Sequence, residues 1–270
     1  MRVFRNLALT ILFVCGAAAQ TQADTLADGG RAVLKANQGA VITIELVLKQ
    51  QFSFSGSASQ ENESKSEATG TVIAPNGLTV LSLSETDPSN IFEIMMAGSG
   101  RNNVTMSTEV REATMLLADG AEIQAEVILR DKDLDMAFLR PTEKQDRVFD
   151  YVDFAGASAV DYLDPVIALN RLGRVARRAH TASIERIEAV VDKPRTFYVP
   201  GKDPTNTGLG SPAFTLDGQP VGVFFLRAIK ASSTGGLASM FGGSGQNVIT
   251  VLLPGADIVE AVDQVPPYKN

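Results

Sequence analysis

The side chains that could perform covalent chemistry are few in this sequence of 270 residues. Its one histidine, His180, stands in the segment R-V-A-R-R-A-H-T-A-S, and its one cysteine, Cys15, lies near the N-terminus. Hydrolysis by a serine needs a nucleophilic hydroxyl, an imidazole that accepts its proton, and a carboxylate that holds the imidazole. Any such site in this chain must therefore use His180 as its base.

Metal and phosphate chemistry find little support in the sequence. Asp131, Asp133 and Asp135 are spaced like the first ligands of a calcium loop, but Met136 and Thr142 stand where that loop needs glycine and glutamate. We therefore reject an EF-hand. Phosphate-binding and dinucleotide-binding loops are missing too, because the longest glycine-rich stretch has no lysine and precedes an expected strand. We expect neither a metal nor a cofactor.

Four arginines form a basic cluster in an acidic chain, whose net charge is −7. One interpretation is a solvated loop; the other is an anchor for an acidic peptide or a carboxylate. The overall acidity argues against nucleic acid or an anionic membrane as the main partner. The cluster consists of Arg171, Arg174, Arg177 and Arg178.

The N-terminal residues have the order of a secretory signal peptide. A basic start (Arg2 and Arg5) precedes an apolar run and a stretch of small residues, with cleavage sites after Ala19 or Ala23. The apolar run is short for a transmembrane helix, so the mature chain is expected to have no membrane span. An uncleaved N-terminal anchor is the alternative. Cleavage would remove Cys15 and exclude disulfides, thiolate zinc sites and cysteine catalysis.

The remainder reads as many short strands between turn signals, which favours a barrel or sandwich protein. Hairpin turns are predicted at Pro75-Asn76-Gly77, Asp119-Gly120 and Asp217-Gly218. The stretch from Ser53 to Thr69 is rich in serine, glutamate and glycine and predicts a solvated loop. A second Gly/Ser-rich loop is predicted over residues 228–246. Short helices are predicted at the two ends, over Asp24 to Asn37 and Gly255 to Val262.

Three segments carry a resemblance to a known family. They are G-T-V-I-A-P-N-G-L-T-V-L-S-L-S, L-A-D-G-A-E-I-Q-A-E-V-I-L-R-D-K-D-L-D-M-A-F-L-R and N-T-G-L-G-S-P-A-F-T-L-D-G-Q-P-V-G-V, which begin at Gly70, Leu117 and Asn206. Taken in order, they resemble the HtrA-type (Deg-type) trypsin-like serine proteases. The resemblance covers nearly the whole mature chain and leaves no length for the PDZ domain that such proteases usually carry.

The resemblance implies an all-β fold of two six-stranded barrels with short N- and C-terminal helices, and a site in the cleft between the barrels. We expect a signal peptide over residues 1–23, one barrel over 24–145 and a second over 146–270, which includes the closing helix. The chain is then an HtrA-like protein that is exported to the periplasm or the extracellular space.

The resemblance also places the catalytic positions, and two of the three are lost. The carboxylate position is Asp135, which we interpret as a turn-end residue that forms local hydrogen bonds. The histidine position holds Ser84, whose hydroxyl is no base near neutral pH. The nucleophile position holds Leu209, or Gly210 if one residue is deleted after Asn206.

We therefore expect a catalytically inactive trypsin-fold protein that binds a peptide or protein through the inter-barrel cleft or its loops. The alternative is a serine endopeptidase with a rearranged site, in which Ser211 is the nucleophile and His180 the base; otherwise we interpret His180 as a surface histidine. A third hypothesis is a structural subunit that associates with an active protease or with copies of itself.

Overall fold

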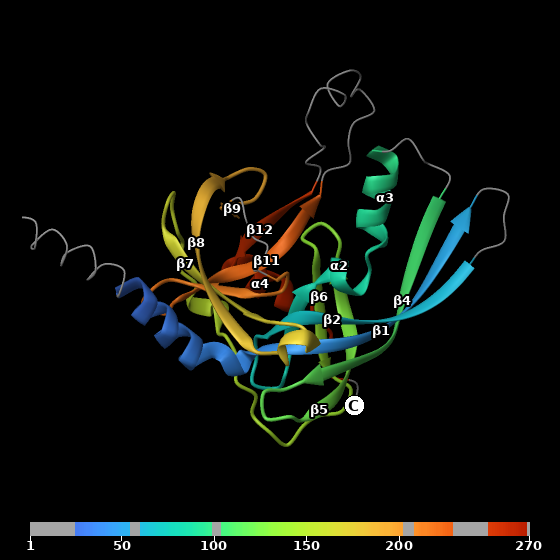
Figure 1. Cartoon of the computed structure of the whole chain (residues 1–270), viewed down its shortest axis with the longest axis horizontal. Coiled ribbons are helices and arrows are strands. Elements are labelled where there is room, and N and C mark those ends of the chain that lie inside the picture. Colours follow the sequence, from blue (N-terminus) through green and yellow to red (C-terminus); the bar gives the residue numbers. More distant parts are fainter. Residues whose placement is uncertain (1–24, 55–59, 99–103, 202–207, 229–247, 269–270) are drawn as a thin grey trace, which may run out of the picture.

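Two closed antiparallel β-barrels, each of six strands, form the body of the protein (Figure 1). The computed structural model describes residues 25–54, 60–98, 104–201, 208–228 and 248–268. The first barrel closes in the order β1-β2-β3-β6-β5-β4 and the second in the order β10-β11-β12-β9-β8-β7. The expected double barrel is thus confirmed, and the segment from 142 to 164 links its halves.

The first barrel forms because its strands alternate apolar and polar side chains. Ile42, Ile44 and Leu46 are fully buried inside it, as the pleat of a strand requires when one face meets a core. Its strands are β1 (Val41–Phe54), β2 (Gln60–Val72), β3 (Thr79–Ser82), β4 (Val104–Leu116), β5 (Glu122–Asp131) and β6 (Met136–Pro141).

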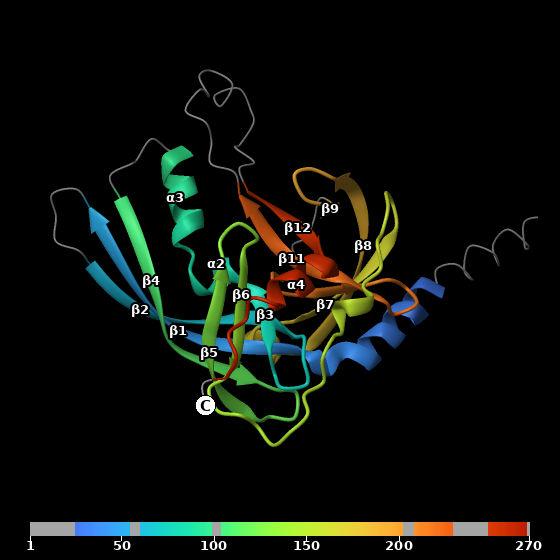
Figure 2. The same ribbon diagram turned by 180° about the vertical axis from the view of Figure 1, so that it is seen from behind.

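The second barrel has shorter strands and a smaller interior, which includes Val166, Ile187 and Phe224. A helix over residues 25–37 lies beside it, and α4 (Gly255–Val262) follows its last strand (Figure 2). The strands are β7 (Pro165–Arg171), β8 (His180–Val191), β9 (Phe197–Pro200), β10 (Pro212–Phe214), β11 (Pro220–Ala228) and β12 (Val248–Pro254).

All three predicted hairpin turns are present. Gly77, Gly120 and Gly218 have φ values of +87°, +85° and +89°, a conformation that suits glycine because it has no Cβ. Each turn joins two antiparallel neighbours, so that local chemistry fixes the register of β2 with β3, β4 with β5, and β10 with β11.

A shared apolar core lies where the barrels meet. Phe138 of β6, Phe214 of β10 and Phe225 of β11 are buried in one cluster with Ile258 of α4. Because side chains from both barrels fill this cluster, each barrel buries apolar surface that it would otherwise expose, and the seam residues are held in fixed positions.

The predicted loop from Ser53 to Thr69 is wrong for its described part, while its residues 55–59 lie outside the described residues. β1 continues to Phe54 and β2 begins at Gln60, and the two strands stay paired from Val41↔Thr71 to Phe52↔Gln60. Together with β4 they form a three-stranded arm that extends beyond the barrel (Figures 1 and 2). The polar composition misled the prediction, because β2 is exposed between Gln60 and Glu63 and pairs there through its backbone, which needs no apolar side chains.

Helical segments connect the strands on the rim. They are α2 (Leu83–Thr86), α3 (Ser89–Gly98) and three short 3-10 turns, η1 (Gln38–Ala40), η2 (Phe154–Gly156) and η3 (Arg174–Ala176). Among the described residues, no helix is long and apolar enough to cross a membrane. The predicted signal peptide over 1–23 and nearly all of the predicted loop over 228–246 lie outside the described residues.

Candidate functional site

The carboxylate position, Asp135, lies in the turn that joins β5 to β6. The side chain of Asp131 builds this turn by accepting hydrogen bonds from the backbone N–H groups of Asp133 (2.9 Å) and Leu134 (3.0 Å). Asp135 itself has φ of +57°, in the left-handed region, and is only 8% exposed. A left-handed backbone is unfavourable for most residues, so the contacts of Asp135 must hold it there.

The Asp135 carboxylate accepts four hydrogen bonds. The hydroxyls of Ser82 and Ser84 each donate at 2.5 Å, the backbone N–H of Ser84 donates at 2.9 Å, and the backbone N–H of Leu226 donates at 2.9 Å. Ser82 and Ser84 belong to the first barrel and Leu226 to the second. Asp135 therefore joins the two barrels, which extends the predicted role as a residue that forms local hydrogen bonds.

Burial dominates the electrostatics of this site. It raises the pKa of the Asp135 carboxyl above its ordinary value, while the four donated hydrogen bonds act in the opposite direction. Burial also raises the pKa of Glu85 on α2, and the negative charge of Asp135 raises it further. Burial therefore favours the uncharged form of both carboxyl groups, and the one histidine, His180, lies elsewhere, at the start of β8.

Ser84, the predicted histidine position, contacts the Asp135 carboxylate directly. Its hydroxyl and its N–H both point at one oxygen of Asp135, which is the contact that an imidazole would make with the carboxylate of a triad. The Ser84 hydroxyl already donates a hydrogen bond to the carboxylate. A serine hydroxyl is also too weak a base to take a proton from a second alcohol. The structure thus brings Ser84 and Asp135 together without forming a base.

The predicted nucleophile loop, from Gly208 to Pro212, is fixed in the inter-barrel seam. The hydroxyl of Thr71 donates to the Gly210 carbonyl at 2.7 Å, and the Gly210 N–H donates to the Phe224 carbonyl at 2.8 Å. Gly210 has φ of +78°, and a Cβ there would lie 2.2 Å from the Thr69 carbonyl oxygen. Only glycine fits, because every other residue would collide with β2.

Neither predicted nucleophile position carries an alcohol, and the N–H groups of Gly210 and Ser211 are hydrogen-bonded to carbonyls of Phe224 and Gly208. Leu209 is partly buried, Gly210 is buried, and the N–H of Ser211 points to the Gly208 carbonyl at 3.3 Å. An oxyanion hole needs amides that are free to meet the substrate oxygen. In this conformation, the N–H groups of Gly210 and Ser211 meet protein carbonyls instead.

The alternative pair, Ser211 and His180, is not assembled in this structure. Ser211 is fully buried, and its hydroxyl oxygen has no hydrogen-bond partner among the described residues; the same is true of His180 Nε2. His180 begins β8 and lies against the backbone of Gln38 and Val41. Burial lowers its pKa and the charge of Arg171 lowers it further. His180 is half-buried, so it lies at the surface but is less exposed than a freely solvated histidine.

Three of the four clustered arginines bind groups of this protein. Arg174 forms ion pairs with Glu45 and Glu67, and Arg178 pairs with Glu67 at 2.6 Å. Arg171 donates to the Leu116 carbonyl at 3.0 Å. These contacts run from the second barrel to the first, so the arginines link the barrels. A role in anion binding stays a prediction for the exposed Arg177.

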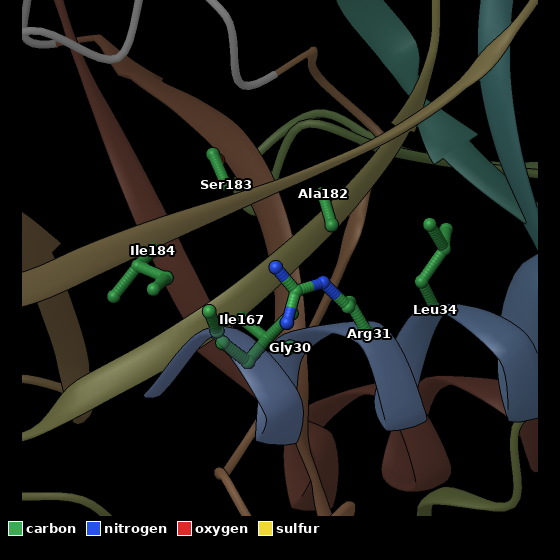
Figure 3. Close-up of a pocket in the computed structure, with 8 residues that line it drawn as sticks. Gly30, Arg31, Leu34, Ile167, Ala182, Ser183 and Ile184 are labelled. Carbon is green, nitrogen blue, oxygen red and sulfur yellow. The ribbon is translucent and has the colours of Figure 1, made fainter. Parts of the chain in front are cut away.

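A separate hollow lies between the helix over 25–37 and strands β7 and β8, with a volume of about 160 Å³. Figure 3 shows Arg31 reaching from the helix toward Ala182 of β8, with Ile167 of β7 and Ile184 of β8 on one side of it and Leu34 on the other. Its walls are mainly apolar, and Arg31 forms an ion pair with Asp28.

Within the described ranges, no group of three or more His, Cys, Asp or Glu side chains could hold a metal ion.

Three participants in the seam were not predicted from the sequence: Ser82, Thr71 and the N–H of Leu226. Ser82 ends β3 and Ser84 lies in α2, in the sequence L-S-L-S, and this spacing is the signal that could have indicated two hydroxyls converging on one acid. Leu226 N–H offers no such signal, because a backbone donor is present at every residue.

The fold is that of a solved protease. The structure is similar to that of an HtrA-type protease, AlgW, determined with a tripeptide, with a TM-score of 0.51 and 14% sequence identity over 87% of this chain. The chain has a trypsin-like fold. It spans 62% of the length of that protease chain. No family model matches the sequence, and neither does a curated protein.

Proposed function

We propose that this trypsin-like chain is a catalytically inactive protein of the cell envelope that binds an extended peptide or protein segment between its barrels. The observation that carries the proposal is the occupied carboxylate: Asp135 holds the hydroxyls of Ser82 and Ser84 where catalysis requires an imidazole. A triad enzyme loses a factor of about 10⁴ to 10⁶ when one member is removed, and this chain lacks two.

The binding surface that the geometry favours is the edge of β11 beside Asp135. β10 pairs with β11 only between Pro220 and Val223, whereas β12 pairs with it as far as Ala228. The N–H groups of Phe224 and Leu226 point away from β12, to Ser211 and Asp135. By alternation, Ala228 N–H points to the same side, where no described strand pairs with it. Because the N–H of Leu226 is bonded to Asp135, an extended peptide can pair with this edge only beyond Leu226, at Ala228.

A test of inactivity uses the mature chain with unfolded casein and with a fluorophosphonate probe that labels activated serines. We expect neither cleavage nor labelling. Labelling that disappears in Ser211→Ala would establish the rearranged endopeptidase instead. Casein cleavage that survives Ser211→Ala would also refute inactivity and would require a different catalytic serine.

A test of binding uses fluorescence anisotropy with labelled casein-derived peptides. Ala228→Pro removes an N–H that β12 does not use, whereas the matched control, Ala228→Val, keeps it. One lost backbone hydrogen bond corresponds to about a three- to tenfold weaker affinity. Equal affinities for the two variants would place binding elsewhere on the protein.

A further inference from the structure

The outer edge of β2 in the arm has no neighbouring strand among the described residues. β2 pairs with β1 from residue 60 to residue 71, but with β3 only from Gly70 to Val72. Figures 1 and 2 both show β2 on the outside of the arm, with α3 on the opposite, β4 side. The first ten residues of β2 are therefore an edge strand, which is a template for a further strand.

The backbone groups that face outward on this edge can be assigned. Ile73 N–H donates to the Leu78 carbonyl across the β2–β3 hairpin, so Ile73 directs its backbone groups toward β3. In antiparallel sheets this direction alternates from residue to residue. The odd-numbered residues thus present N–H and C=O groups to the outer edge, and no described residue bonds to that edge between residues 60 and 68. These residues are Glu61, Glu63, Lys65 and Glu67.

Space for another strand exists beside the inner part of this edge. A hollow of about 310 Å³ is lined by Lys65, Ser66, Glu67, Arg174 and Val175. Val175 is completely exposed, although it is apolar, and it forms part of the wall next to β2. A strand laid along the edge would enter this hollow and cover Val175, which would remove an apolar side chain from water.

We propose that the occupant is β2 of a second copy of this chain, paired antiparallel about Ser64. In that register Glu63 of each copy lies opposite Lys65 of the other, which gives two cross-strand pairs of opposite charge on the exposed face. Both residues present their backbone to the edge, so each pair is also hydrogen-bonded. A two-fold axis makes the contact self-complementary and closes it as a dimer.

The same register places Glu61 of one copy opposite Glu67 of the other, and the existing ion pairs reduce this repulsion. Glu67 already contacts Arg174 and Arg178, and Glu61 pairs with Lys49 at 2.9 Å. The Arg174 side chain is 58% exposed, so its guanidinium can also meet an incoming carboxylate. A register shifted by one pair also sets Glu61 against Lys65, but it places Glu63 against Glu63 on the axis, where no described cation contacts either glutamate.

The test exploits this charge pattern, because two single variants each place like charges across the axis. In Glu63→Lys, lysine faces lysine; in Lys65→Glu, glutamate faces glutamate. Each variant should dimerise at least about tenfold more weakly than the natural chain in sedimentation velocity at micromolar concentrations. Both substitutions lie on an exposed strand, and circular dichroism checks that the fold is unchanged.

Mixing the two single variants decides the matter, since lysine then faces glutamate at both pairs. We expect the mixture, and separately the double variant Glu63→Lys with Lys65→Glu, to recover the dimer. A natural chain that is monomeric throughout, or a dimer that neither variant weakens, would overturn the proposal. So would a mixture that stays monomeric, because the edge would then serve a different partner.

Discussion

Replacing Asp135 with asparagine probes the contact on which the seam depends. Each oxygen of the carboxylate accepts two hydrogen bonds, one from a hydroxyl and one from a backbone N–H. Ser84 supplies both donors to Oδ1, and Ser82 and Leu226 supply the hydroxyl and the N–H to Oδ2. An amide has one oxygen and one NH₂ group. In either orientation of the amide, its NH₂ group faces one serine hydroxyl and one backbone N–H. The hydroxyl can rotate to accept a hydrogen bond, but the backbone N–H cannot, so it loses its acceptor.

The expected loss in the free energy of unfolding follows from that one unsatisfied backbone N–H. A buried donor without an acceptor costs about 1–3 kcal/mol, and Asp135 is 8% exposed, so water cannot replace the lost acceptor. For a protein of this size, 1 kcal/mol lowers the unfolding midpoint by about 2–4 °C. Asp135→Asn should therefore lower the midpoint by roughly 2–12 °C.

The pH dependence has a definite sign. Burial raises the pKa of Asp135 in the folded state, so its contribution to stability is full below the unfolded pKa and is lost as the pH rises through the folded pKa. Asparagine does not titrate. The cost of Asp135→Asn should therefore decrease as the pH rises above about 4, the ordinary value for aspartate.

The assay is urea unfolding followed by circular dichroism between acidic and neutral pH. The matched control is Asp133→Asn, two residues away on the same turn and exposed, which should change stability by less than about 0.5 kcal/mol. If the two variants are equally stable, the Asp135 bridge does not stabilise the fold. If the cost grows with pH, the assigned direction of the pKa shift is wrong.

Three further predictions concern the same seam. Glu67→Gln should destabilise the protein by about 1 kcal/mol at neutral pH, with the exposed Glu112→Gln as control. Because Arg174 and Arg178 lower the Glu67 pKa despite its burial, this cost should disappear as the pH falls below the ordinary glutamate value; a constant cost would refute the ion-pair interpretation. Gly210→Ala should cost about 3 kcal/mol or more in thermal unfolding, since its Cβ would strike β2, whereas Gly218→Ala, with an open site and a similar φ, should cost about 1 kcal/mol. If the two variants lose the same stability, the positive φ explains both losses and the contact of the Cβ with β2 adds nothing. Glu85→Gln should stabilise the protein by about 0.5 kcal/mol at neutral pH, because burial disfavours the charged form of Glu85; chemical denaturation that shows a loss would contradict this.

Local chemistry in the sequence was sufficient for the three hairpin turns and for the buried face of β1, whereas the double barrel was implied only by the family resemblance. The Asn-Gly and Asp-Gly turns fix where the chain reverses, and the alternation of Ile42, Ile44 and Leu46 fixes which face is buried. The arm was missed because β2 between Gln60 and Ser66 has almost no apolar residues. Its pairing with β1 is a long ladder of backbone bonds, which composition does not reveal.

The roles of the charged residues needed the structure. Arg174 and Arg178 lie more than a hundred residues from Glu67, and a cluster of cations in the sequence gives no indication that its partners stand on another barrel. Ser211 and His180 likewise looked usable as a pair until burial and separate surroundings set them apart. These properties depend on distances across the fold, which sequence separation does not measure.

The sequence by itself determined which chemical groups the chain possesses: one imidazole, no alcohol at Leu209, and a serine at position 84. No arrangement of the chain can alter that inventory. Only the tertiary structure decided which donors the Asp135 carboxylate accepts hydrogen bonds from, because the Leu226 N–H reaches it from the other barrel. It alone also showed that no described strand continues along the outer edge of β2, since β3 pairs with it only from Gly70 to Val72.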